Sequence, residues 1–330
     1  MSAKRYSYSI VIGAAALAFA HFAPAVQAQT TYPVKPIRIL VGFQPGGFTD
    51  TSARIVGAQL AEALGQQVIV ENRPGANSAI AGELTAKSPP DGYTFFMCHP
   101  GIATNPVLYD NYPVNPLKDF VTVSLVAAIP NILVVHPSVP AKSVKELLAI
   151  ARSRPGSLTQ ASAGLGSPGQ LSGELLQQMT QTKFLHVPYK GSGPALIDLV
   201  GGHVDLSFPT ISAGLSMVKA GKLRALGTTS SKRSPMLPDV PPIGETVPGF
   251  DVLGWYGLVG PAGIPKDIVS RISSEIARMV KTPEVRERLL REGADPIGST
   301  PEAFASYLAD EVRKWTKVIK AAKIQPSKIR

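Results

Sequence analysis

Short apolar segments alternate with amphipathic segments along the first third of the chain. The residues from Ile37 to Phe43 form an apolar run with a single charge, which has the length of a buried strand and stops at Pro45-Gly46-Gly47. Asp50 and Thr51 are candidate N-caps for the helix that follows. The alternation predicts a parallel sheet covered by helices on both faces, with strands at 37–43, 67–71 and 93–97 and helices at 50–64 and 78–87.

The same alternation starts again in the middle of the chain and predicts a second α/β lobe. Its strands are expected at 131–135, 158–163, 184–188, 204–208 and 223–227, and its helices at 143–152, 170–180, 193–200 and 214–220. A proline-rich segment from 235 to 248 then indicates a long connection. The chain closes with a short strand at 254–260 and helices at 266–280, 283–292 and 301–322.

The N-terminus has the order of a secretory signal peptide. Lys4 and Arg5 precede an apolar run from Ile10 to Ala20, and the small-residue site Val26-Gln27-Ala28 follows. The run is roughly half of the ~20 residues needed to cross a bilayer, so it does not predict a membrane anchor. No cysteine stands directly after Ala28, which argues against a lipid anchor. We therefore expect a signal peptide at 1–28, cleavage after Ala28 and export to the periplasm.

Composition and charge narrow the possible ligands of the exported chain. Cys98 is the only cysteine, so no intramolecular disulfide can form. The formal net charge of +10 falls to about +8 without Lys4 and Arg5, since 31 basic and 23 acidic residues remain. The basic residues are spread thinly, without the interleaved aromatic residues of a nucleic-acid surface. The positive charge therefore fits an anionic ligand or an anionic membrane surface, and no nucleic-acid partner is expected.

Two glycine-rich turns between a strand and a helix are candidate anion sites. One runs from Gly42 to Gly47 and is followed by Asp50, and the other runs from Ser162 to Gly169. Glycine permits the positive φ that brings backbone close to a ligand, and the helix that follows presents unpaired N–H groups. Neither turn contains Lys or Arg, so we expect backbone N–H groups to meet the charge. The alternative is that the glycines serve tight turns alone.

Motifs for chemistry are incomplete in this sequence. Gly164, Gly166 and Gly169 match a dinucleotide-binding pattern, but no acidic residue lies about 20 positions further on. The esterase pattern around Ser167 fails because Leu165 occupies its first glycine position, and Ser216 with Lys219 lacks companion motifs. The histidines have no metal-ligand spacing. We therefore expect no catalytic residues, no cofactor and no metal.

Several stretches, in order along the mature chain, resemble the Bug-type receptors of tripartite tricarboxylate transporters, the TctC-like family. They are Tyr32-Pro33-Val34-Lys35-Pro36-Ile37-Arg38, Pro45-Gly46-Gly47-Phe48-Thr49-Asp50, Val70-Glu71-Asn72-Arg73-Pro74-Gly75-Ala76, Pro90-Asp91-Gly92-Tyr93-Thr94, Val187-Pro188-Tyr189-Lys190-Gly191 and Gly201-Gly202-His203-Val204-Asp205. The resemblance implies a two-lobed periplasmic-binding-protein (Venus-flytrap) fold with parallel-rich sheets flanked by helices. It places lobe 1 at 29–128 plus 255–330 and lobe 2 at 129–254.

The resemblance also implies a function and a site. The receptor would capture a small organic carboxylate in the cleft between the lobes, partly through water, as a monomer that serves a membrane permease. The implied ligand-binding residues are Phe43, Gly46, Gly47, Asp50, Ala76, Asn77, Ser78, Ser162, Gly164, Ser167, Tyr189 and Asp205. Asn77 and Ser78 replace a glycine turn that many members have, and Pro168, Gly169 and Gln170 stand where a histidine is frequent. The ligand itself is therefore not specified.

Two alternative functions share some of these signals. A sensor would present its closed form to a membrane signalling protein instead of a permease. An exported hydrolase would use Ser167 or Ser216 as its nucleophile. A pull-down of membrane partners separates the first alternative from a transport receptor, and a screen for turnover separates the second.

Overall fold

The first lobe is built on a six-stranded mixed sheet in the order β11-β4-β10-β3-β1-β2. The computed structural model describes residues 32–189 and 191–329 of the chain. β1 lies between β2 and β3 and is parallel to both, whereas β10 runs antiparallel to β3 and β4. The strands are β1 (Ile37–Val41), β2 (Val68–Asn72), β3 (Thr94–Cys98), β4 (Phe120–Pro130), β10 (Leu253–Pro261) and β11 (Asp295–Pro296).

The second lobe has a five-stranded sheet in the order β7-β6-β8-β5-β9. β6 is parallel to β7 and β8, whereas β5 is antiparallel to β8 and β9. The strands are β5 (Ile132–Val135), β6 (Thr159–Ser162), β7 (Leu185–Pro188), β8 (Leu206–Ser207) and β9 (Arg224–Thr228). The alternation of strands and helices predicted these elements, but not the reversed direction of β5 and β10.

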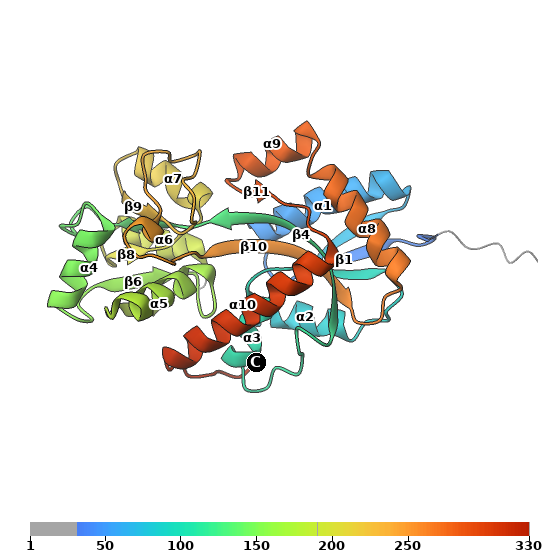
Figure 1. Cartoon of the computed structure of the whole chain (residues 1–330), viewed down its shortest axis with the longest axis horizontal. Helices are drawn as coiled ribbons and strands as arrows, with labels where there is room; N and C mark the ends of the chain where they lie inside the picture. The colour runs from blue at the N-terminus through green and yellow to red at the C-terminus, as the bar shows by residue number, and fades with distance from the viewer. Residues whose placement is uncertain (1–31, 190, 330) are drawn as a thin grey trace, which may run out of the picture.

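Helices cover both sheets, as the apolar pattern predicts (Figure 1). The first lobe holds α1 (Phe48–Leu64), α2 (Ala79–Ala86), α3 (Gly101–Leu108), α8 (Lys266–Met279), α9 (Pro283–Arg291) and α10 (Pro301–Ala321). The second lobe holds α4 (Val144–Ser153), α5 (Pro168–Thr180), α6 (Ser192–Val200) and α7 (Ile211–Lys219). Short 3₁₀ turns lie at Ala76–Ser78 and Ile243–Glu245. None of the helices in the described ranges is long and apolar enough to span a membrane.

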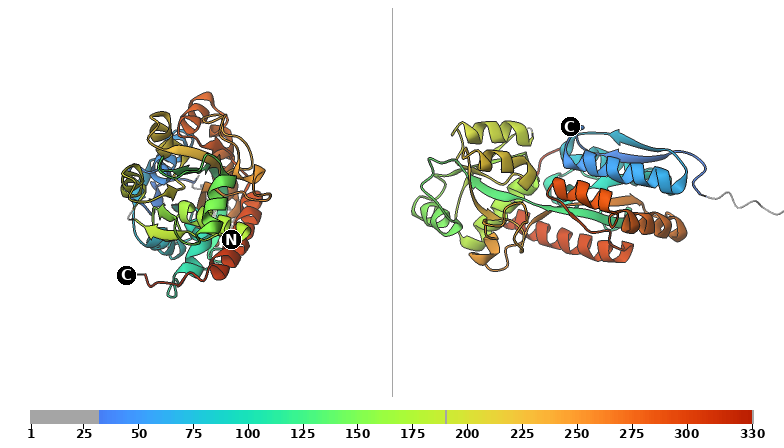
Figure 2. Two further views of the ribbon diagram at one scale, coloured as in Figure 1. Left: turned by 90° about the vertical axis from the view of Figure 1, so that its left-hand side faces the viewer. Right: turned by 90° about the horizontal axis from the view of Figure 1, so that it is seen from above.

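The two lobes are joined by the long antiparallel pair β4 and β10. Figure 1 and the right-hand view of Figure 2 show these strands running from the first sheet towards the second lobe. Asn131 alone separates β4 from β5, so the strand path continues directly into the second sheet. The pairing extends from Leu253 opposite Pro130 to Pro261 opposite Phe120. The crossing is therefore a continuous β-ribbon.

Helix α10 braces the crossing. It packs on β4 and α3 and reaches α5 of the second lobe. Figure 1 shows it in red below the two crossing strands. Trp255 of β10 and Trp315 of α10 are both buried, and each indole N–H donates to the Glu311 Oε2 at 2.8 Å. A single buried carboxylate thus satisfies two buried donors and holds the helix against the ribbon.

Of two predicted helix N-caps, the structure confirms one and contradicts the other. Ser143 caps α4 as predicted, because its hydroxyl accepts the Glu146 amide at 3.2 Å. The prediction that Asp50 or Thr51 caps the next helix is wrong. Helix α1 begins at Phe48 after Gly47, and Asp50 lies in its first turn. Its carboxylate is engaged by other groups, as described below.

Candidate ligand-binding site

A cavity of about 1150 Å³ lies between the two lobes. The first lobe lines it with the turns that follow β1 and β2, and the second lobe with the turn after β6, the start of α6 and the end of β8. His99, Tyr109, Asn131 and Tyr256 complete the lining. The walls come from both lobes, so a molecule bound here contacts both of them at once.

Seven of the twelve residues implied by the resemblance line this cavity, namely Phe43, Gly47, Ala76, Asn77, Ser162, Gly164 and Ser167. The other five, Gly46, Asp50, Ser78, Tyr189 and Asp205, do not line it in this structure. Three of these five, Gly46, Asp50 and Ser78, belong to hydrogen-bond networks that hold residues of the lining in place.

Asp50 holds the turn after β1 in shape. Its carboxylate accepts the Gly46 amide at 3.1 Å and hydrogen bonds from Arg54 at 2.9 and 3.0 Å. The Asn72 side-chain amide lies 2.9 Å from the Asp50 Oδ1 and also donates to the Phe43 carbonyl at 3.0 Å. Burial by itself would raise the pKa of Asp50, but the hydrogen bonds from Arg54, Asn72 and Gly46 outweigh it and lower the pKa. Asp50 therefore positions this turn as a carboxylate.

Ser78 and His99 form a buried pair, of which His99 lines the cavity. The Ser78 Oγ lies 2.8 Å from the His99 Nε2, and the Gly101 amide donates to the Nδ1 at 3.3 Å. Because Nδ1 accepts, the ring proton is assigned to Nε2 and the Ser78 oxygen accepts it. Burial lowers the pKa of His99 to about 4, so the ring is uncharged at neutral pH. The Phe43 ring packs edge-on against it with centroids 4.7 Å apart.

The turn after β6 is held by its own side chains. The Ser162 Oγ lies 2.7 Å from the His186 Nε2 and accepts the Gly164 amide at 3.1 Å. The Gly166 amide donates to the Gln170 Oε1 at 2.7 Å. Gly164 and Gly166 have φ of +124° and +74°, a region that favours glycine. Hydrogen bonds within the second lobe thus set the shape of this turn.

Tyr189 and Asp205 are engaged elsewhere in the second lobe. The Tyr189 hydroxyl donates to the Asp198 carboxylate at 2.7 Å. The Asp205 Oδ2 accepts the Thr159 amide and the Thr159 hydroxyl, both at 2.7 Å. These bonds hold Tyr189 against α6 and Asp205 at the start of β6, so any effect of Asp205 on a ligand would be transmitted through the sheet.

Two helix N-termini reach the cavity from opposite lobes without a side-chain cap. Helix α1 starts after Gly47 and α6 starts after Gly191, and neither glycine has a side chain that could cap the helix. Helices α5 and α7 differ, because Ser167 and Thr210 cap their first turns. The N–H groups of the first three residues of α1, and of Ser192 and Gly193 in α6, have no acceptor within their helices and carry a partial positive charge. The cavity is therefore suited to a small anion.

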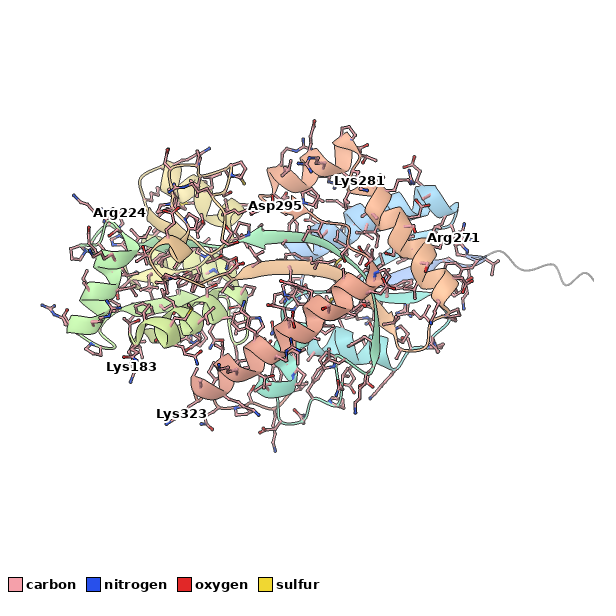
Figure 3. The ribbon with its side chains drawn as sticks, viewed as in Figure 1. Lys183, Arg224, Arg271, Lys281, Asp295 and Lys323 are labelled. Atoms are coloured by element: carbon pink, nitrogen blue, oxygen red, sulfur yellow. The ribbon has the colours of Figure 1, made fainter. Side chains whose placement is uncertain are left out.

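The described lining of the cavity contains no Lys, Arg, Asp or Glu. The basic side chains labelled in Figure 3 include Lys183, Arg271, Lys281 and Lys323, which are exposed on the outside of the molecule. Of the described lining residues that can titrate, His99 is neutral by burial, and burial raises the pKa of Tyr109 and Tyr256. The described residues therefore meet an anion with dipoles and hydroxyl groups.

Sequence reasoning missed part of the lining. It did not identify His99, Tyr109, Asn131 or Tyr256, nor the start of α6. The Gly191-Ser192-Gly193-Pro194 run was a usable signal, since it places two flexible residues and a proline at a helix start. His99 also directly follows β3, at the same edge of the sheet as the turn after β1.

Comparison with known proteins agrees with this architecture. Residues 52–324 match the model of the tripartite tricarboxylate transporter family receptor. The chain is 39% identical over 311 residues to the UPF0065 protein in the tcbD-tcbE intergenic region of Pseudomonas sp. (strain P51), covering 94% of this chain and 93% of that protein. It is 37% identical over 293 residues to protein BugT of Bordetella pertussis, covering 88% and 90% of the two chains.

Two solved structures of similar proteins carry carboxylate ligands. R. palustris Rpa4515 with adipate has a TM-score of 0.80 and 37% identity, covering 90% of this chain and all (100%) of that one. MatC (Rpa3494) from Rhodopseudomonas palustris with bound malate has a TM-score of 0.77 and 34% identity, covering 87% and 100%. These matches confirm the predicted two-lobed periplasmic-binding-protein fold. The chain belongs to the tripartite tricarboxylate transporter receptor family.

Proposed function

We propose that this protein captures a small organic carboxylate in the cavity between its lobes and delivers it to the permease of a tripartite tricarboxylate-type transporter. The observation that carries the proposal is the pair of uncapped helix N-termini, at Gly47 of α1 and Gly191 of α6, which reach one cavity from opposite lobes. A carboxylate between them accepts hydrogen bonds from both lobes. Binding then favours the conformation in which the lobes are closest, because only that conformation makes both sets of contacts.

The twelve residues implied by the resemblance divide into two roles in this proposal. Those that line the cavity, such as Gly47 and Ser167, would contact the ligand or its bridging waters. Asp50, Gly46 and Ser78 would act as positioning residues, because their bonds hold the turns around the ligand. Tyr189 and Asp205 would support the second lobe.

The ligands of relatives support a carboxylate, since adipate and malate are bound in similar proteins.

The proposal includes a monomeric receptor, cleavage after Ala28 and a periplasmic location; residues 1–28 lie outside the described residues. It also includes binding without catalysis. The hydroxyl of Ser167, one candidate nucleophile, accepts the Gln170 amide at 3.4 Å, and the other candidate, Ser216, is exposed on α7.

The test uses the purified mature chain, residues 29–330, with a panel of organic acids. A ligand at 100 times its dissociation constant raises the unfolding free energy by about 2.7 kcal/mol, which a thermal melt detects. Acids that shift the melt are then titrated by calorimetry, and the mixtures are checked by NMR for products. The proposal fails if none of the acids binds or if an acid is turned over. Co-purification with the permease, compared with membrane signalling proteins, separates transport from sensing.

A further inference from the structure

Resting on the proposed carboxylate receptor, we propose that its ligand carries an apolar body of about six carbons or more, as a chain or an aromatic ring. The carboxylate would lie at the helix N-termini, and the body would pack on the walls between them. Short, hydroxylated acids of the size of malate would be poor ligands.

Six of the side chains that line the cavity are large and apolar, and two of them, Pro194 and Leu196, belong to the start of α6. Phe43 and Pro74 come from the first lobe, and Leu165, Pro194, Leu196 and Phe208 come from the second. An apolar ligand body that packs on these side chains removes apolar surface of both the ligand and the protein from water, which favours binding. Each additional buried methylene strengthens binding about fourfold.

The size of the cavity indicates the same ligand. The lobes already meet on one side of it, because a Cβ on Gly166 would stand 2.5 Å from the Leu108 Cδ1 and 2.6 Å from the Asn77 Nδ2. Closure on that side therefore has little room left. The cavity nonetheless measures about 1150 Å³, which exceeds the roughly 300–1,000 Å³ of typical ligand pockets. A four-carbon acid would leave most of its walls facing water.

Two neighbouring residues on α6 provide a matched pair for testing the walls. Leu196 lines the cavity and is half-buried, whereas Ile197 is 72% exposed and points away from it. Both are large aliphatic residues on the same helix. Replacing each by Asn removes a similar apolar side chain, but only one of the two replacements changes the surface that the ligand body would contact.

The first experiment titrates the mature protein by calorimetry with butyrate, hexanoate and benzoate and with malate, succinate, adipate and terephthalate. We expect adipate to bind about 16-fold more tightly than succinate, and hexanoate about 16-fold more tightly than butyrate, since each pair differs by two methylenes. Malate or succinate binding as tightly as adipate and terephthalate would overturn the apolar body and leave the carboxylate receptor intact. Failure of every acid would overturn both.

The second experiment compares Leu196→Asn with Ile197→Asn, after thermal melts establish that both are folded. We expect Leu196→Asn to weaken the binding of the tightest acid about tenfold and to change succinate little, while Ile197→Asn matches the wild type. Equal affinities in the two variants contradict the proposal. If Leu196→Asn does not fold, Leu165→Asn, on the turn after β6, replaces it.

Discussion

Gly166 of the second lobe lies directly against Asn77 of the first. A Cβ on Gly166 would be 2.6 Å from the Asn77 side-chain nitrogen, which donates to the Asn105 Oδ1 at 3.1 Å. Asn105 in turn donates to the Asn77 carbonyl at 3.0 Å, so the two asparagines hold each other in place. The absence of a side chain at Gly166 is therefore a condition for the lobes to approach on this side.

Replacing Gly166 by Ala should hold the lobes apart. The new methyl group meets Asn77 and Leu108, and φ of +74° adds strain of roughly 1 kcal/mol. We expect affinity for the carboxylate to fall at least tenfold, and small-angle scattering with saturating ligand to report a more extended molecule. Gly221→Ala is the control, because its φ is +68° and nothing lies within 4 Å of the added Cβ. Equal loss of affinity in the two variants would show that strain alone is responsible.

Gly46 and Gly47 should respond differently to substitution. The expected positive φ occurs at Gly46, at +95°, whereas Gly47 is extended with φ of −83°. Gly46→Ala should therefore lower the unfolding free energy by about 1 kcal/mol. Gly47→Val has open space at its Cβ and should melt like the wild type, but its side chain borders the cavity and should weaken binding. Calorimetry and thermal melts of both variants measure these effects. An unchanged affinity in Gly47→Val would remove this turn from the site.

Asp50→Asn should loosen the turn after β1 in a pH-dependent way. The pKa of Asp50 is lower in the folded chain than in the unfolded chain, where it is about 3.9. The carboxylate therefore stabilises the fold above about pH 4, and this contribution is lost as the pH falls through the folded pKa. We expect a deficit of about 1–2 kcal/mol at pH 7 in urea unfolding, since hydrogen bonds to a charged group are lost. The difference in unfolding free energy between the variant and the wild type should shrink in strongly acidic buffer. A difference that does not change with pH would contradict a stabilising role for the charge of Asp50.

Glu311→Leu should destabilise the crossing between the lobes. It leaves the indole N–H groups of Trp255 and Trp315 buried without their acceptor, at a cost of about 2–4 kcal/mol for the two donors. Glu311→Gln keeps an acceptor oxygen and should lose less. Both tryptophans of the protein are in this cluster, so urea unfolding followed by tryptophan fluorescence reports on it directly. Equal losses in the two variants would contradict a hydrogen-bonding role.

Local pattern identified most elements of the fold. The apolar run at 37–43 predicted β1, and Ser143 marked the start of α4 by its own hydroxyl. The sequence did not predict α3 or β4. Helix α3 contains Pro106 and is mostly buried, so it lacks a polar face, and β4 continues past the usual strand length because it joins two sheets.

The site, like the fold, has parts that local sequence predicted and parts that only the tertiary structure revealed. The glycine turns at 42–47 and 162–169 could be predicted from the sequence. A positive φ and a helix start each depend on only a few neighbouring residues. Only the tertiary structure decided that Asp50 supports its turn through Arg54 and Asn72, and that Asp205 bonds to Thr159.

The sequence by itself determined the alternation of strands and helices, the glycine turns with their lack of charge, and the Ser143 cap of α4. Propensity and apolar period act over neighbours within one or two helical turns, and a single chain carries that information. Only the tertiary structure brought His99, Tyr109, Asn131 and Tyr256 to one cavity. These residues lie up to 157 positions apart in numbering, from His99 to Tyr256. Their meeting depends on how β10 inserts antiparallel between β3 and β4, which only packing of the whole chain decides.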